Sequence, residues 1–158
     1  MSTGRAVCPE CGATLPDSGD CWTRVHQLLE IETRVLPGLD SEHGMRAHFF
    51  AIASYQLQHP FRVGADTLPV LRDSVRRALG PSAPPIAHIR HEMGRHMTSG
   101  AKAGRMAAPG DRSHVDPAWP REWTVTAEDV LAGSEQDYPQ AVRSWAASTV
   151  DDLDRALG

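Results

Sequence analysis

Cys8-Pro9-Glu10-Cys11-Gly12 contains two of the three cysteines in this chain of 158 residues, and the third, Cys21, follows after a short spacer. In a Cys-Pro-x-Cys-Gly turn the two sulfurs point to the same side, and the glycine leaves the backbone free to fold beneath a thiolate-bound ion. Three cysteines cannot all pair in disulfides, and a close Cys-x-x-Cys in a reducing compartment favours metal binding or redox chemistry. The spacing therefore predicts a zinc knuckle over residues 1–21, with a redox-active dithiol or unliganded thiols as the alternatives.

The fourth ligand has to come from elsewhere, because a structural zinc site takes four ligands. A helix is predicted from Asp20, its N-cap, to about Leu36, and a second from about Ser41 to His59. Since few residues separate them, these helices should form an antiparallel hairpin. Cys21 then lies level with the end of the second helix, which makes His59 the favoured fourth ligand.

Other groups could supply the fourth ligand instead of His59. The candidates are His48, Asp17, Asp20, His26 and a water molecule. His48 and His59 share a helix face but stand about 16 Å apart along the axis, so one ion cannot take both. His26 follows Cys21 by five residues and should point about 140° away from it. His48 is therefore the main alternative to His59.

The remaining chain predicts further helices over residues 67–79, 86–97, 126–132 and 138–157. The second helix should bury a stripe of Met45, His48, Ile52, Tyr55 and His59. The last helix should pack on the hairpin through Val142, Trp145, Ala146, Thr149, Leu153 and Leu157. Residues 99–120 are rich in Gly, Ala and Pro, which is typical of a loop or a flexible linker.

One all-α domain over residues 1–158 is therefore expected, a helical bundle with its zinc knuckle clipped onto the hairpin. Its parts are the knuckle (1–21), a helical core (21–80), a polar helix with a flexible linker (81–120) and C-terminal helices that pack back (121–158).

Several polar side chains invite a functional interpretation. His48, Tyr55 and Gln58 could line a polar pocket on the second helix. We favour the simpler hypothesis that they are core groups, with His48 hydrogen-bonded to Glu30 or Glu32 on the facing helix. His88, Glu92 and His96 lie on one strip of a helix, and a solvated face is the preferred interpretation there.

Charge and hydropathy exclude several classes of protein. The net charge is −4, which argues against nucleic-acid or membrane-surface binding through bulk electrostatics. Basic residues gather between 86 and 112, and acids predominate from Glu122 onward, so we expect these segments to attract each other. No apolar run is long enough for a membrane span and no leader sequence is visible. The expected location is the cytoplasm.

A family resemblance emerges from several of these motifs taken together. They are Cys8-Pro9-Glu10-Cys11-Gly12, Cys21 before Leu28-Leu29-x-x-Glu32, His48, and Tyr55-Gln56-Leu57-Gln58-His59-Pro60. The C-terminal motifs are Trp119-Pro120, Trp123-Thr124-Val125, Asp129-Val130-Leu131, Tyr138-Pro139 and the helix around Trp145. The chain resembles an uncharacterised bacterial family, a domain of unknown function.

The resemblance implies a single domain and no particular activity. It directs attention to Cys8, Cys11, Cys21, His48, Tyr55, Gln58 and His59, whereas His26 is outside its pattern and residues 86–116 have no match. We expect a cytoplasmic protein with structural Zn²⁺ that binds a protein or a small molecule. The alternatives are a metal-dependent enzyme that uses helix histidines and, third, a nucleic-acid-binding zinc module.

Overall fold

The computed structural model describes residues 4–17, 19–100 and 112–158, with side chains for all of these except 96–100. Within these residues the chain forms six α-helices and three 3₁₀ turns. In chain order they are α1 (Cys21–Val35), η1 (Leu36–Gly38), α2 (Ser41–Gln58), η2 (Pro60–Arg62), α3 (Thr67–Leu79), α4 (Ile86–Gly100), α5 (Ala127–Ala132), η3 (Glu135–Asp137) and α6 (Tyr138–Leu157). The predicted all-α, single-domain fold is confirmed.

Local signals explain where these helices begin. The Asp20 carboxylate accepts a hydrogen bond from the Trp22 amide at the start of α1. Asp40 does the same for the His43 amide at the start of α2. These side chains satisfy amides that have no partner within the first turn of a helix. The predicted capping box at α5 is also present, formed by Thr126 and Asp129.

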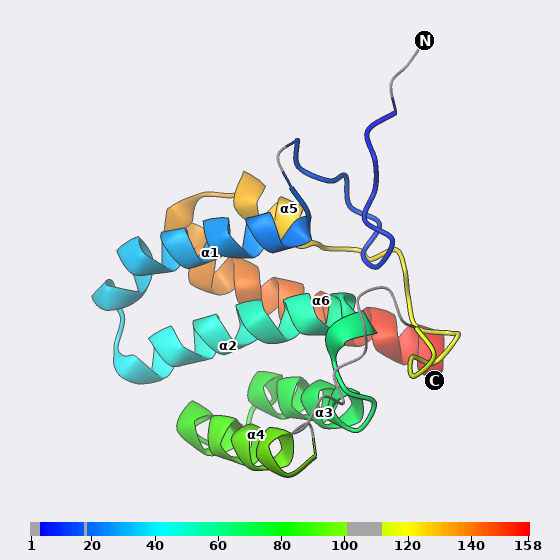
Figure 1. Cartoon of the computed structure of the whole chain (residues 1–158). Coiled ribbons are helices and arrows are strands. Elements are labelled where there is room, and N and C mark those ends of the chain that lie inside the picture. Colours follow the sequence, from blue (N-terminus) through cyan, green and yellow to red (C-terminus); the bar gives the residue numbers. More distant parts are fainter. Residues whose placement is uncertain (1–3, 18, 101–111) are drawn as a thin grey trace.

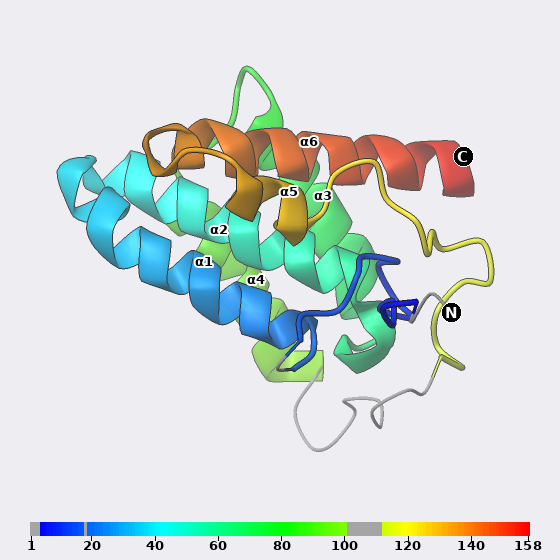
Figure 2. The ribbon, with the colours of Figure 1, turned by 90° about the horizontal axis from the view of Figure 1, so that it is seen from above.

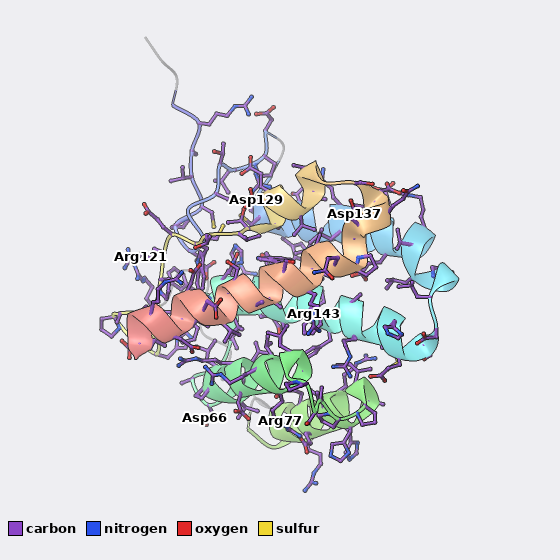
Figure 3. The ribbon with its side chains drawn as sticks, turned by 180° about the vertical axis from the view of Figure 1, so that it is seen from behind. Asp66, Arg77, Arg121, Asp129, Asp137 and Arg143 are labelled. Atoms are coloured by element: carbon purple, nitrogen blue, oxygen red, sulfur yellow. The ribbon has the colours of Figure 1, made fainter. Side chains whose placement is uncertain are left out.

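The helices form a bundle around α2. α1 and α2 are antiparallel and joined through η1, and α6 runs alongside α2 in the same direction (Figures 1 and 2). α3 and α4 lie on another side of α2, whereas α5, which carries Asp129, lies against α1 (Figure 3). The start of α1 and the end of α2 thus meet at one end of the bundle, beside the N-terminal segment.

The buried face of α2 differs from the predicted stripe. Of that stripe only His59 is fully buried, and Met45, His48, Ile52 and Tyr55 are half-buried. The fully buried positions of α2 are Gly44, Ala47, Phe50, Ala51, Ala53, Ser54, Leu57 and Gln58. Because α2 is surrounded by α1, α3, α4 and α6, most of its circumference is covered, and a single stripe cannot be recognised in its sequence.

The prediction for α6 is confirmed at almost every position. Val142, Trp145, Ala146, Thr149 and Leu153 are all buried, and Leu157 is half-buried. α6 has its most extensive contact with α2. Its amphipathic pattern was readable because one side of α6 remains exposed to solvent.

The last part of the predicted linker packs on the core. Val115 and Trp119 are buried, and the Trp119 indole donates a hydrogen bond of 2.9 Å to the Leu57 carbonyl. The flexibility predicted for residues 101–111 lies outside the described residues. Among the helices that the structure describes, none combines the length and the apolar character needed to cross a bilayer.

Candidate metal centre

The N-terminal segment folds into a tight turn that brings Cys8 and Cys11 together. The Cys8 amide donates to the Ala13 carbonyl at 2.8 Å, and the Gly12 amide donates to the Cys8 carbonyl at 2.9 Å. Gly12 has a φ of 76°, in the left-handed region that glycine adopts at little cost. The turn predicted from Cys-Pro-x-Cys-Gly is therefore present, and both cysteines are buried.

The open end of the α1–α2 hairpin supplies the other two members of the cluster. Cys21 is the first residue of α1, and His59 is the C-cap residue that directly follows α2. One ligand atom from each of Cys8, Cys11, Cys21 and His59 lies within 4.8 Å of the other three. All four residues are buried, so the structure gathers the predicted set into a group that could hold a metal ion.

The spacing within this group is close to that of a bound ion. The sulfurs of Cys11 and Cys21 stand 3.6 Å apart. Two sulfurs on one tetrahedral zinc stand about 3.8 Å apart, given Zn–S bonds of about 2.3 Å. Small side-chain adjustments would therefore be enough to close the site around an ion.

The His59 ring is oriented for binding through Nε2. Its Nδ1 lies 2.8 Å from the Tyr55 carbonyl, to which it can only donate. Nε2 is buried and has no hydrogen-bond partner within the described structure. Tyr55 stacks on the same ring, with 4.0 Å between the ring centroids. An imidazole ring with one nitrogen bonded to a carbonyl and the other nitrogen free is typical of a metal-bound histidine.

The pKa values of Cys8, Cys11 and His59 depend strongly on the neighbouring sulfurs. Hydrogen bonds from the thiols of Cys11 and Cys21 lower the pKa of Cys8. Hydrogen bonds to Cys21 and Cys8 raise the pKa of Cys11. Burial opposes protonation of His59, but the nearby sulfurs of Cys21 and Cys8 outweigh it and raise its pKa to about 9. The cluster thus favours a cation beside the Cys8 thiolate.

Three further residues support the cluster and were missed in the sequence. Arg24, which is buried, places a guanidinium nitrogen 3.6 Å from the Cys21 sulfur and donates to the Thr14 carbonyl. Glu10 accepts from the Phe61 amide at 2.9 Å, just after His59. The Trp123 indole donates to the Glu10 carbonyl at 3.4 Å. Of these three residues, only Arg24 could have been found from the sequence, because it lies one turn after Cys21 on α1.

The other candidate ligands lie elsewhere. His48 is bonded to Glu32, as the simpler hypothesis predicted, with 2.7 Å between His48 Nδ1 and Glu32 Oε2. His26 is exposed and packs on Trp22. Asp20 caps α1, and Asp17 is outside the group of ligand atoms. His59 is therefore the histidine that the fold brings to the cysteines.

The three residues of the predicted polar pocket, His48, Tyr55 and Gln58, have different partners in the described structure. Gln58 is buried between helices, where its side-chain amide donates to the Val125 carbonyl at 2.7 Å and to Thr149 at 3.0 Å. Tyr55 stacks on His59, near the cysteines, whereas His48 lies two helical turns before Tyr55. The three side chains therefore face different surroundings along α2.

The strip of His88 and Glu92 is exposed to solvent, as predicted. His88 Nε2 lies 3.1 Å from a Glu92 oxygen, and Glu92 also pairs with Arg77 of α3, which Figure 3 labels. The side chain of His96 lies outside the described ones. The arrangement resembles an ordinary surface ion-pair network.

Substitution of Gly12 by alanine should destabilise the knuckle. A left-handed φ costs a non-glycine residue about 1–2 kcal/mol, and an added Cβ would lie 2.8 Å from the Arg121 carbonyl oxygen. The chain at Arg121 passes beside the N-terminal segment (Figure 3). Thermal unfolding of Gly12→Ala should therefore show a lower melting temperature than that of the wild type.

Gly38→Ala is the matched control, because nothing lies within 4 Å of an added Cβ there and its φ is not in the left-handed region. Equal melting temperatures for the two variants would contradict the assignment of strain to Gly12.

No curated protein and no solved structure matches the chain. A family model matches residues 6–154, a range that includes the four clustered residues and every helix up to α6. The chain therefore belongs to a family of unknown function, DUF5946.

Proposed function

We propose that this is a zinc protein of the bacterial cytoplasm, in which Cys8, Cys11, Cys21 and His59 hold a structural ion. The ion would fasten the N-terminal segment onto the open end of the α1–α2 hairpin. The observation that carries the proposal is the buried His59 Nε2, which has no partner while Nδ1 is held by Tyr55. Three free, buried cysteines support a reducing location.

A structural role fits the site better than a catalytic one. Three thiolates and one imidazole complete a tetrahedron around zinc and leave no position for a substrate. Zinc with three thiolates carries one net negative charge, and the buried Arg24 beside Cys21 supplies a positive charge to offset it. We therefore favour a binding or interaction protein whose helical body is stabilised by the metal.

The two alternatives receive less support. The described residues contain one group with the composition of a metal site, and it holds a single histidine, so an enzyme using several helix histidines has no visible centre. The nucleic-acid alternative would require strongly salt-dependent binding through residues 90–112. The net charge of −4 works against such binding.

Metal content measured by mass spectrometry tests the proposal. The purified wild type should contain one zinc per chain, Cys21→Ser and His59→Ala should lose most of it, and His48→Ala should retain it. His48→Ala is the matched control, since it removes a histidine from α2, the helix for which His59 is the C-cap. A wild type without zinc after refolding in excess zinc would overturn the proposal. Loss of zinc in His48→Ala but not in His59→Ala would overturn the choice of ligand.

Arg24→Met should weaken zinc binding by about 10–100-fold, the usual effect of losing a supporting residue around a metal. Methionine keeps much of the aliphatic volume but removes the charge and the hydrogen bonds to Cys21 and Thr14. Competition with a chromophoric chelator measures the affinity. Arg34→Met, which changes an exposed arginine of α1, should leave the affinity unchanged. Equal affinities for both variants would rule out a supporting role for Arg24.

A further inference from the structure

A second polar cluster lies on α2 toward the end opposite the cysteines. Glu32 of α1 has only 7% of its side chain exposed, yet it bonds to two groups. One oxygen lies 2.5 Å from the Tyr138 hydroxyl, and the other lies 2.7 Å from His48 Nδ1. Burial and the hydrogen bond to Glu32 raise the pKa of Tyr138, so its hydroxyl stays a donor. The cluster joins α1, α2 and α6.

This cluster also sets the chemistry of His48. With Nδ1 facing a carboxylate, the neutral ring carries its proton on Nδ1 and leaves Nε2 as a hydrogen-bond acceptor. The side chain of His48 is 38% exposed, and no described residue bonds to Nε2. A buried carboxylate thus fixes the tautomer of a histidine that reaches the surface. A histidine that served only to hold three helices together would not need to be exposed.

The exposed side of His48 borders a pocket. Its volume is about 290 Å³, near the lower end of the range for small-molecule sites, and it opens to solvent on one side. Leu36, Leu39 and Met45 give it apolar walls. Arg90, from the second turn of α4, lines it from another element. The pocket therefore combines an apolar surface with one hydrogen-bond acceptor and one cation.

The two charged side chains that line the pocket differ in how they are bonded. Asp40 also lines it, but its carboxylate accepts from the His43 amide at 2.9 Å and contacts the His43 ring at 2.6 Å. Arg90 is exposed and has no acidic partner among the described residues. Arg90 is therefore the charged group of the pocket that has no ion-pair partner among the described residues, and a free guanidinium is suited to binding an anion.

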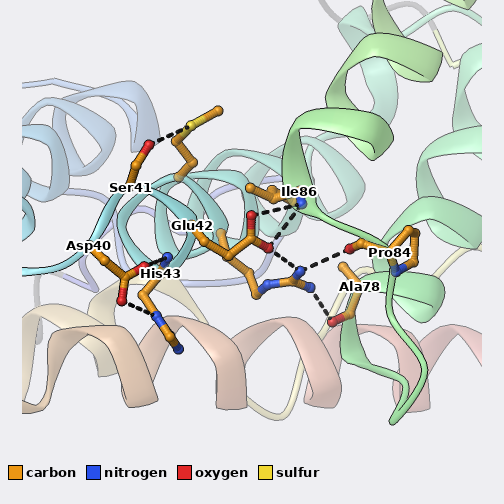
Figure 4. Close-up of polar contacts among 9 residues, drawn as sticks. Asp40, Ser41, Glu42, His43, Ala78, Pro84 and Ile86 are labelled. Carbon is orange, nitrogen blue, oxygen red and sulfur yellow. Dashed lines mark hydrogen bonds and ion pairs between the residues drawn. The ribbon is translucent and has the colours of Figure 1, made fainter.

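Polar contacts fix the position of α4 relative to α2, the two helices that line this pocket. Figure 4 shows Glu42 of α2 accepting from the Ile86 amide, at 3.0 Å and 3.2 Å, where α4 begins. Arg46 pairs with Glu42 and donates to the Ala78 and Pro84 carbonyls at 2.8 Å and 3.0 Å. The first turn of α4 is therefore anchored to α2, and Arg90 follows one turn later. The fold therefore fixes the position of the Arg90 backbone relative to His48.

We propose that this pocket binds a small organic acid. The carboxylate pairs with Arg90, the apolar part covers Leu36, Leu39 and Met45, and a donor group of the ligand bonds to His48 Nε2. The site is independent of the metal centre, because His48 and His59 are about 16 Å apart along α2. Ser41 also lines the pocket, but it lies two turns from His48 and its hydroxyl contacts Met45 at 3.5 Å, so binding is proposed and no covalent step.

An NMR titration of the full chain with 4-hydroxybenzoate and with 3-hydroxybutyrate tests the proposal, and 4-hydroxybenzamide serves as the neutral control. At least one acid should cause saturable shifts at the Leu39 and Gly44 amides and at His48 Nε2, while the amide binds at least about tenfold more weakly. Arg90→Ala should weaken binding of the acid by about tenfold, as expected for the loss of a charge-assisted contact. Arg95→Ala, which changes an exposed arginine about 140° around the same helix, should not.

The Gly44→Ala variant distinguishes binding in the pocket from binding elsewhere on the protein surface. An added Cβ would have ordinary contacts, 3.7 Å and 3.8 Å from atoms of Leu36, so the fold should tolerate it. Because Gly44 lines the pocket, the added methyl should reduce binding while the melting temperature is unchanged or higher. The proposal is overturned by an absence of saturable shifts with both acids. Equal binding of the amide, or unchanged binding by Arg90→Ala, overturns it as well.

Discussion

Removal of zinc by a chelator is expected to lower the melting temperature by about 8–16 °C. This follows if the ion is present at about a thousand times its dissociation constant, which adds about 4 kcal/mol to the free energy of unfolding. In a domain of this size each kcal/mol corresponds to about 2–4 °C. The effect is large because an empty site leaves three thiols and His59 buried at one end of the bundle. Thermal unfolding with and without chelator measures it.

The loss of stability on removal of zinc should be confined to the N-terminal segment. Amide hydrogen exchange should show residues 4–17 losing protection in the stripped protein, while α2 and α6 remain protected because they have their own apolar core. Cys21→Ser provides the control, since chelator should not change its melting temperature further. An unchanged melting temperature in a protein shown to be free of metal would mean that the ion does not stabilise the fold.

Glu32→Ala is expected to lower the free energy of unfolding by about 3 kcal/mol, because a hydrogen bond to a charged group contributes about 1.5–3 kcal/mol and this carboxylate makes two. The substitution also leaves the buried Tyr138 hydroxyl without its acceptor. Urea denaturation should show a lower midpoint with a similar slope, because the unfolded chain exposes the same surface.

Glu30→Ala is the matched control on α1. The Glu30 side chain is 71% exposed and, among the described residues, pairs with the exposed Arg34 alone, so its removal should change stability by less than about 0.5 kcal/mol. Glu32→Leu combined with Tyr138→Phe should recover part of the loss, since both buried partners are then apolar. Equal effects of Glu30→Ala and Glu32→Ala would contradict the importance of this cluster.

Where local chemistry dominates, the sequence predicted the structure well. α3 and α6 have the predicted bounds, because Gly80 and Pro139 give clear signals at their ends. The gathering of His59 with the cysteines was also predictable. The short loop after α1 makes the hairpin antiparallel, and helix geometry then sets the level of Cys21. Zinc binding itself stays a prediction.

Features that depend on long-range packing were predicted wrongly from the sequence or not predicted at all. The buried face of α2 was predicted wrongly because helices from distant parts of the chain cover it on several sides. The partners of Gln58 are Val125 and Thr149, which no local pattern connects to it. The roles of Glu10 and Trp123 beside the cysteines depend on the same long-range folding.

The sequence by itself thus determined the helices and the turn at Cys8 and Cys11, and it favoured His59 as the residue that joins the three cysteines, because turns, caps and helix periodicity act over a few residues. Only the tertiary structure decided what surrounds them. It placed Arg24 beside the Cys21 sulfur, Tyr55 on the His59 ring and Arg90 at the pocket of His48. These neighbours follow from how whole helices pack, which depends on contacts between residues far apart in the chain.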